Sequence, residues 1–195
     1  YTVQALQEEF GISVEFVNVS REGTMDYDQF SALFSNDIKT LVSLMHVNNE
    51  TGVINDIEKI GAICNQNKAL FHCDTVQSIG KKELNLEELA IDFLVASAHK
   101  FHGPKGAGFA YVRKNLVLQP MIFGGEQEKG WRAGTESVHQ IAGMAKALEL
   151  SFEYLNEERK YITDLKQYCF QKLQQAFPEF SVNGDDTFYN ILNVL

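Results

Sequence analysis

Cysteine, proline and long apolar runs are scarce in this 195-residue chain, which has three cysteines and three prolines. Three cysteines without paired spacing argue against a disulfide scaffold and predict free thiols in a reducing compartment, so we expect a cytoplasmic protein. No signal-peptide pattern is visible, and no apolar run approaches the roughly 18 residues of a membrane span. The sequence therefore predicts a protein that does not cross a membrane.

Basic blocks are also absent. The chain has 17 Lys and Arg against 26 Asp and Glu, a net charge of −9, which excludes a broad nucleic-acid-binding face. Its 45% hydrophobic and 22% charged residues are ordinary for a globular protein. The length suits one sizeable domain, or one and part of another. Because Tyr1 begins at once in a helical pattern and the apolar run 188–195 stops without a turn, we expect a piece of a longer protein.

Apolar periodicity predicts alternating helices and strands before residue 113. The dense apolar run 40–47 predicts a strand covered on both faces. The alternation indicates an α/β protein with a mostly parallel, doubly wound sheet and right-handed crossovers. The expected helices are 1–10 (ending at Gly11), Asp26 or Asp28 to 34, a segment begun by Asn55 or Asp56 with Ile57, Ile60 and Ile63 inward, and 86–90; the expected strands are 14–19, 40–47, 69–73, 93–96 and 108–112.

The pattern after Ser137 becomes helical. Apolar residues recur at helical spacing, which predicts helices over 137–152 and 158–176, with Pro178 ending the second. Short strands are expected at 180–182 and 190–194. We therefore predict two domains: a large domain over 1–157 and the beginning of a smaller α/β C-terminal domain over 158–195.

Polar clusters follow three successive predicted strands, at 46–52, 72–77 and 97–100. In a parallel sheet, ligands bind outside the carboxyl ends of the strands. One cluster alone is weak support for a site, but three on successive strands predict one.

Lys100 is the candidate nucleophile of this site. It follows an apolar run and precedes the glycine-rich segment 103–108, and a lysine that loses hydration is more easily deprotonated. The alternative is a solvated lysine at a strand end. The segment 103–108 lacks the Lys-Ser/Thr ending and the following helix of a phosphate loop, so it predicts a tight hairpin.

These residue types suit pyridoxal 5'-phosphate. That cofactor needs an amine for its aldehyde, a carboxylate for its ring nitrogen, donors for its ring oxygen, and hydroxyl or imidazole groups for its phosphate. Asp74 is the candidate carboxylate, although such a residue also caps helices. The remaining candidates are Gln77 and Asn49 for the ring oxygen, Ser97 and His99 for the phosphate, and Lys100 for the amine.

Four segments resemble those of NifS/IscS-type cysteine desulfurases, in the class V aminotransferase group of fold-type I pyridoxal-phosphate enzymes. They are MHVNNETG (45–52), HCDTVQSIGK (72–81), SAHKFHGPKGAGFAYVR (97–113) and RAGT (132–135). The resemblance covers essentially the whole chain and implies the roles given above, with Lys100 covalently bonded to the cofactor. It also implies that Thr135 reaches the phosphate of a partner subunit's cofactor, and hence a homodimer.

The resemblance implies removal of sulfur from L-cysteine, which leaves alanine and an enzyme persulfide. The sulfur would pass to an iron–sulfur scaffold or another acceptor protein. The alternatives are another class V enzyme, such as a selenocysteine lyase or an aminotransferase, and a non-catalytic scaffold for dimerisation or sulfur transfer.

The nucleophilic cysteine of that family is expected beyond Leu195. Cys64 and Cys169 fall on apolar helix faces, which predicts core thiols, and strand alternation turns Cys73 away from Asp74. The phosphate loop, the stacking histidine and the carboxylate-binding arginine of the family are not found here, so we expect this chain to be inactive alone. His46, His72, His99 and His102 lack metal-ligand spacing, so no metal site is predicted.

Overall fold

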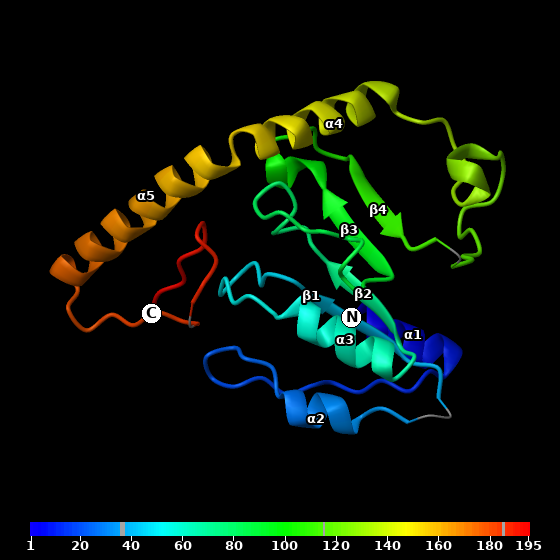
Figure 1. Ribbon diagram of the computed structural model, residues 1–195, viewed down its shortest axis with the longest axis horizontal. Coiled ribbons are helices and arrows are strands. Elements are labelled where there is room, and N and C mark those ends of the chain that lie inside the picture. The colour runs from blue at the N-terminus through cyan, green and yellow to red at the C-terminus, as the bar shows by residue number, and fades with distance from the viewer. Residues whose placement is uncertain (36–37, 115, 185) are drawn as a thin grey trace.

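The computed structural model describes residues 1–35, 38–114, 116–184 and 186–195 and centres on one four-stranded sheet (Figure 1). The strands lie side by side in chain order. The first three are parallel, and the fourth returns antiparallel to the third. This arrangement confirms the α/β class, the mostly parallel sheet and the hairpin. The strands are β1 (Leu41–Met45), β2 (Leu70–Asp74), β3 (Phe93–Ser97) and β4 (Gly108–Val112).

The register brings the three predicted polar clusters to one edge of the sheet. Met45 of β1 lies beside Asp74 of β2, and Asp74 lies beside Val95 of β3. Ser97 ends β3 two residues later. Because the three strands are parallel and in step, the segments that follow them emerge next to one another.

One face of the sheet carries the core. Phe71, Cys73 and Leu94 are fully buried there and pack in one cluster with Ile60 and Cys64 of α3 (Ile57–Gln66). The opposite face is partly open, and Leu41 of β1 is 60% exposed. The prediction that strand 40–47 is covered on both faces is therefore wrong for the described residues, since β1 lies at the end of the sheet and only one side of it is packed.

The predicted helix starts near the N-terminus are confirmed, but the second helix ends at Ala32 instead of residue 34. The first helix, α1 (Thr2–Phe10), ends at Gly11, which adopts a left-handed conformation. Asp26 caps α2 (Tyr27–Ala32) by accepting from the backbone N–H of Gln29, and Asp56 caps α3 in the same way through Lys59. Of the two alternatives at each start, Asp26 and Asp56 are the caps.

Three short elements were predicted wrongly or only in part. Residues 14–19 form no strand and make one isolated bridge, between Val19 and Met25, because no neighbouring strand offers a ladder. Residues 86–90 make hydrogen-bonded turns instead of a helix. In place of the two predicted C-terminal strands, the described residues form one isolated bridge, between Val182 and Val194.

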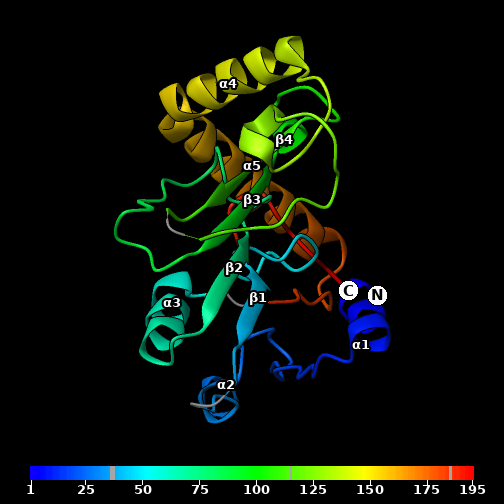
Figure 2. The ribbon, with the colours of Figure 1, turned by 90° about the vertical axis from the view of Figure 1, so that its right-hand side faces the viewer.

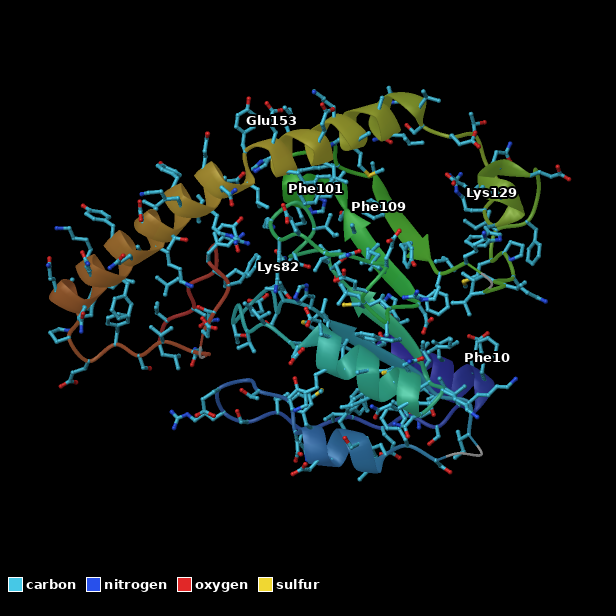
Figure 3. All side chains as sticks on the ribbon, in the orientation of Figure 1. Phe10, Lys82, Phe101, Phe109, Lys129 and Glu153 are labelled. Atoms are coloured by element: carbon cyan, nitrogen blue, oxygen red, sulfur yellow. The ribbon has the colours of Figure 1, made fainter. Side chains whose placement is uncertain are left out.

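Two helices, α4 (Val138–Glu153) and α5 (Leu155–Ala176), form a long arm joined at Tyr154 (Figures 1 and 2). The second begins three residues earlier than predicted. The α4 helix contacts the 3-10 helix η1 (Ala98–Phe101), and Phe101 lies beneath α4 (Figure 3). The last residues return to the β1 end, where the N–H of Phe188 donates to the carbonyl of Gly52 at 2.7 Å. The domain boundary at 157/158 stays a prediction.

In the described part of the chain, no helix is both long enough and apolar enough to cross a membrane.

Candidate cofactor site

The end of β2 presents two polar side chains without strong internal bonds. Asp74, the last residue of β2, is half-buried, and its Oδ1 accepts from the N–H of Val76 at 2.9 Å. No other described group donates to its carboxylate. Gln77 is half-buried in the following turn, and its side-chain amide bonds to no described residue. Both side chains are therefore free to bond a ligand.

The end of β3 leads directly into η1, which carries Lys100. The side chains of Ser97 and His99 share a 2.9 Å hydrogen bond between Oγ and Nδ1. Lys100 is half-buried, and no described residue pairs with its amine. His102 ends η1 in a left-handed conformation (φ 65°) and turns the chain into the hairpin. The predicted hydroxyl, imidazole and amine thus gather within one turn.

The loop after β1, residues 46–52, is shaped by Asn48 instead of Asn49. The Asn48 Oδ1 accepts from the N–H groups of Glu50 and Thr51, each at 2.9 Å. Asn49 is exposed, and its amide donates to the Glu50 carboxylate at 2.7 Å. A ligand that bonds the Asn49 amide must compete with this contact.

Residues 74–82, here called the β2 turn, are fixed by buried polar side chains that the sequence alone did not single out. Thr75 Oγ1 donates to the carbonyl of Val95 at 2.8 Å, Ser78 bonds His46 at 3.0 Å, and Lys81 Nζ donates to the carbonyl of Gln77 at 3.3 Å. The available signal was the polar run over residues 74–82, which only Val76, Ile79 and Gly80 interrupt.

Burial controls the charge of this region. It lowers the pKa of Lys81, and the nearby Lys100 ammonium lowers it further, while Glu158 acts in the opposite sense. Burial also lowers the pKa of His46 to about 4, with a smaller effect from Lys82. His46 is therefore neutral at pH 7, whereas the lysines give the strand ends a positive character that suits an anionic ligand.

Two of the three cysteines are inert core thiols. Cys64 and Cys73 are 1% and 0% exposed, and burial raises the pKa of each thiol to about 12. Cys73 lies on the packed face of the sheet, opposite Asp74, as predicted. Cys169 was also predicted to be a core thiol, but it is exposed, because Leu155 is the one residue that α5 buries among those described.

Thr135 is not brought to the other predicted residues. It is exposed in the segment between the 3-10 helix η2 (Gln127–Gly130) and α4. That segment and η2, which carries Lys129, extend away from the strand ends beyond β4 (Figures 1 and 3). No group of three or more His, Cys, Asp or Glu side chains among the described residues could hold a metal ion.

A cavity of about 570 Å³ lies between α5 and residues 186–192, and Lys82 and Arg159 contribute to its wall. Lys82 lies between the sheet and the C-terminal segment (Figure 3). None of the predicted cofactor residues lines this cavity. The candidate site is thus a surface along the strand ends, distinct from this cavity.

Known proteins resemble the chain over nearly its whole length. A cysteine desulfurase IscS of Mannheimia succiniciproducens is 43% identical over 185 residues, which cover 94% of this chain and 45% of that protein. A cysteine desulfurase IscS of Dictyoglomus turgidum is 39% identical over 177 residues, which cover 91% of this chain and 45% of that protein. The chain thus spans a little under half the length of these curated relatives.

A solved structure has the same fold. A NifS-like protein superposes with a TM-score of 0.93 at 36% identity, over 99% of this chain and 53% of that one. Residues 1–194 match the family described as "Aminotransferase class-V". These similarities confirm the resemblance found in the four sequence segments, and the chain belongs to the class V aminotransferase family.

Proposed function

We propose that this chain supplies the lysine-bearing part of a pyridoxal-phosphate site in a cysteine desulfurase. The observation that carries the proposal is the convergence of Asp74, Ser97 and Lys100 at the ends of two adjacent parallel strands. The names of the curated relatives support the reaction class.

The donor set fits the cofactor. Lys100 offers an amine that no described residue pairs with, and Asp74 keeps one carboxylate oxygen free for a protonated ring nitrogen. Gln77 and Asn49 offer amides for the ring oxygen. Ser97 and His99, already joined by a hydrogen bond, offer a hydroxyl and an imidazole for phosphate. When bound, pyridoxal phosphate supplies an aldehyde that bonds amines and a ring that withdraws electrons.

The proposed overall reaction breaks the carbon–sulfur bond of L-cysteine. The sulfur forms a persulfide with an acceptor thiol and alanine leaves, so the atoms balance without a further reductant. Cys64 and Cys73 are unsuited as the acceptor thiol because both are buried and hold their protons at neutral pH. Cys169 is exposed, but the family resemblance implies an acceptor cysteine beyond Leu195. We therefore propose that the acceptor is none of the three cysteines in this chain, and that the chain alone does not turn over cysteine.

The full enzyme is proposed to be a cytoplasmic homodimer that delivers sulfur to an iron–sulfur scaffold or another acceptor protein. The position of Thr135 supports the dimer, because its segment extends away from the site of its own chain and is exposed. A residue so placed can reach a phosphate held by a second copy.

The test is covalent attachment of the cofactor at Lys100. Purified protein is incubated with pyridoxal phosphate, reduced with borohydride, desalted and analysed by peptide mass spectrometry beside Lys100→Ala. We expect a cofactor adduct on the peptide with Lys100, together with a visible absorbance band before reduction, and neither in the variant. Lys105→Ala, a lysine in the neighbouring hairpin, is the matched control and should keep the adduct.

An adduct distributed over several lysines, or one that persists in Lys100→Ala, would contradict the assignment of Lys100. Release of alanine from L-cysteine by this chain alone would contradict the proposal that the acceptor cysteine lies outside it.

A further inference from the structure

His46 lies at the base of the 46–52 loop and is almost fully buried, at 1% exposure. Its Nδ1 is 3.0 Å from the hydroxyl of Ser78, which belongs to the β2 turn. Its backbone N–H donates to the carbonyl of Asp74 at 2.8 Å and continues the ladder between β1 and β2. Both contacts join the end of β1 to the β2 turn.

The loop above His46 is closed by its own hydrogen bonds. The N–H of Asn48 donates to the carbonyl of Val53, and that of Gly52 donates to the carbonyl of Asn48, each at 2.9 Å. Together with the two bonds to Asn48 Oδ1, they make the loop a compact unit. Since such a unit moves as one body, the contact at its base sets the direction in which Asn49 points.

The hydroxyl of Ser78 has one proton and two neighbouring acceptors. The carbonyl of Thr75 is 3.3 Å away and already accepts the N–H groups of Ser78 and Ile79, each at 2.9 Å. The imidazole of His46 is closer, at 3.0 Å. The shorter of the two contacts, the one with Nδ1 of His46, is the one that links the two segments.

We propose that His46, through its hydrogen bond with Ser78, positions the 46–52 loop, and with it Asn49, against the β2 turn. The two predicted donors to the cofactor's ring oxygen, Asn49 and Gln77, lie on these two segments, so the bond sets their mutual spacing. His46 touches no predicted cofactor atom itself. The relevance of this role to cofactor binding rests on the function proposed above.

The first test compares cofactor affinity in variants of the bond. Ser78→Ala and His46→Leu remove it, whereas His46→Asn keeps an acceptor near the position of Nδ1. We expect Ser78→Ala to weaken binding of pyridoxal phosphate about five- to tenfold, the loss typical of one buried hydrogen bond. His46→Leu should weaken binding at least as much, and His46→Asn should restore most of the affinity.

A control separates positioning from general destabilisation. Ile60→Val removes one methyl group from a fully buried side chain of α3. Ile60 takes no part in the hydrogen bond between His46 and Ser78. It should lower the melting temperature and leave the affinity unchanged at a temperature well below melting. Equal losses of affinity in Ile60→Val and Ser78→Ala would overturn the proposal.

A second measurement does not depend on the cofactor. Amide hydrogen exchange should become faster at 48–52 in Ser78→Ala, while exchange within α3 stays as in the wild type. The loop tip keeps its contacts with the C-terminal segment, from Phe188 N–H to Gly52 and from Asn193 to Glu50, so the change should be largest near the base. Unchanged exchange at 48–52 would overturn the proposal. Faster exchange in a protein that binds no pyridoxal phosphate at Lys100 would instead refute the proposed function and leave the positioning of the loop standing.

Discussion

The sheet region and the helical arm are held in place in different ways. Residues 41–112 bury a continuous apolar cluster around Phe71 and Leu94, and the strand ends that form the site project from it. The α4 and α5 helices bury one described residue each, Ser151 and Leu155. The site is therefore rigid because of packing beneath it, whereas the arm is joined to it mainly where the partly buried Met144, Ala147 and Leu148 of α4 pack against the core cluster.

Those contacts are identifiable. Met144 and Leu148 of α4 pack against the cluster that includes Phe101, and Arg159 of α5 donates to the carbonyl of Lys81 at 3.2 Å. Each joins the arm to a segment that carries a candidate site residue. A substitution should therefore matter most in the sheet region, and in the arm mainly where α4 packs over η1 or α5 meets the β2 turn.

The largest expected effect is a core truncation in β2. Phe71→Ala should lower the free energy of unfolding by about 3–5 kcal/mol, because a fully buried ring is replaced by a cavity. Tyr168→Ala on α5, where the side chain is 58% exposed, should change it by less than about 0.5 kcal/mol. Urea unfolding followed by circular dichroism measures both. Similar losses of stability at the two positions would contradict the inference that the sheet region is held by packing and α5 is not.

The second effect is a dependence on pH that comes from His46. Its pKa in the folded chain is about 4, below its ordinary 6.5, so the unfolded chain binds the extra proton more readily. The stabilisation is complete above about pH 6.5 and is lost as the pH falls toward 4, about 3 kcal/mol in total. Between pH 7.5 and 4.5 the wild type should therefore lose more stability than His46→Asn in urea unfolding. Equal losses in the two proteins would show that His46 does not titrate in this way.

The third effect concerns the glycine at which the β2 turn meets η1. Gly80 has φ +76°, and a Cβ there would lie 2.7 Å from the Cβ of Phe101. Gly80→Ala should cost about 1–3 kcal/mol from backbone strain and overlap. Gly11→Ala has a similar φ but open space around it, so it should cost about 1 kcal/mol. Thermal unfolding of the two variants gives the difference, and an equal cost would mean that the contact with Phe101 relaxes freely.

The smallest effect compares two helix starts. Asp56 accepts a 2.9 Å hydrogen bond at the start of α3, whereas Ser137 makes no capping bond at the start of α4. Asp56→Ala should cost about 1 kcal/mol and Ser137→Ala only a few tenths. The midpoints of urea unfolding give both values. A cost at Ser137 as large as that at Asp56 would indicate that the arm has a cap in solution.

The sequence was most informative where a feature is local. The strands that contain Phe71, Leu94 and Phe109 were found because each is a short apolar run bounded by polar or glycine residues. The start of α3 was narrowed to Asn55 or Asp56 because a capping side chain acts three residues along the chain, and the structure selects Asp56. The strand predicted from the alternating run 14–19 was wrong. A strand also needs a neighbouring strand to pair with, and the run itself does not reveal that neighbour.

The site was predictable to the same extent. Asp74, Ser97 and Lys100 follow strands, and parallel strands end at one edge, so their proximity could be inferred. The bond between His46 and Ser78 spans 32 positions in the chain, and no periodicity connects residues so far apart. What remains hidden in a sequence is this kind of polar contact, which depends on the register between strands.

Because the three thiols differ in burial, their rates of reaction with a thiol reagent can measure local unfolding of the core. Cys169 is exposed and should react with a thiol reagent at once, whereas Cys64 and Cys73 should react only when the core admits solvent. Cys64 lies on α3 and Cys73 on β2, so the two slow modification rates would measure how often the helix separates from the sheet. Two equal slow rates would indicate that α3 and β2 open together in one cooperative event.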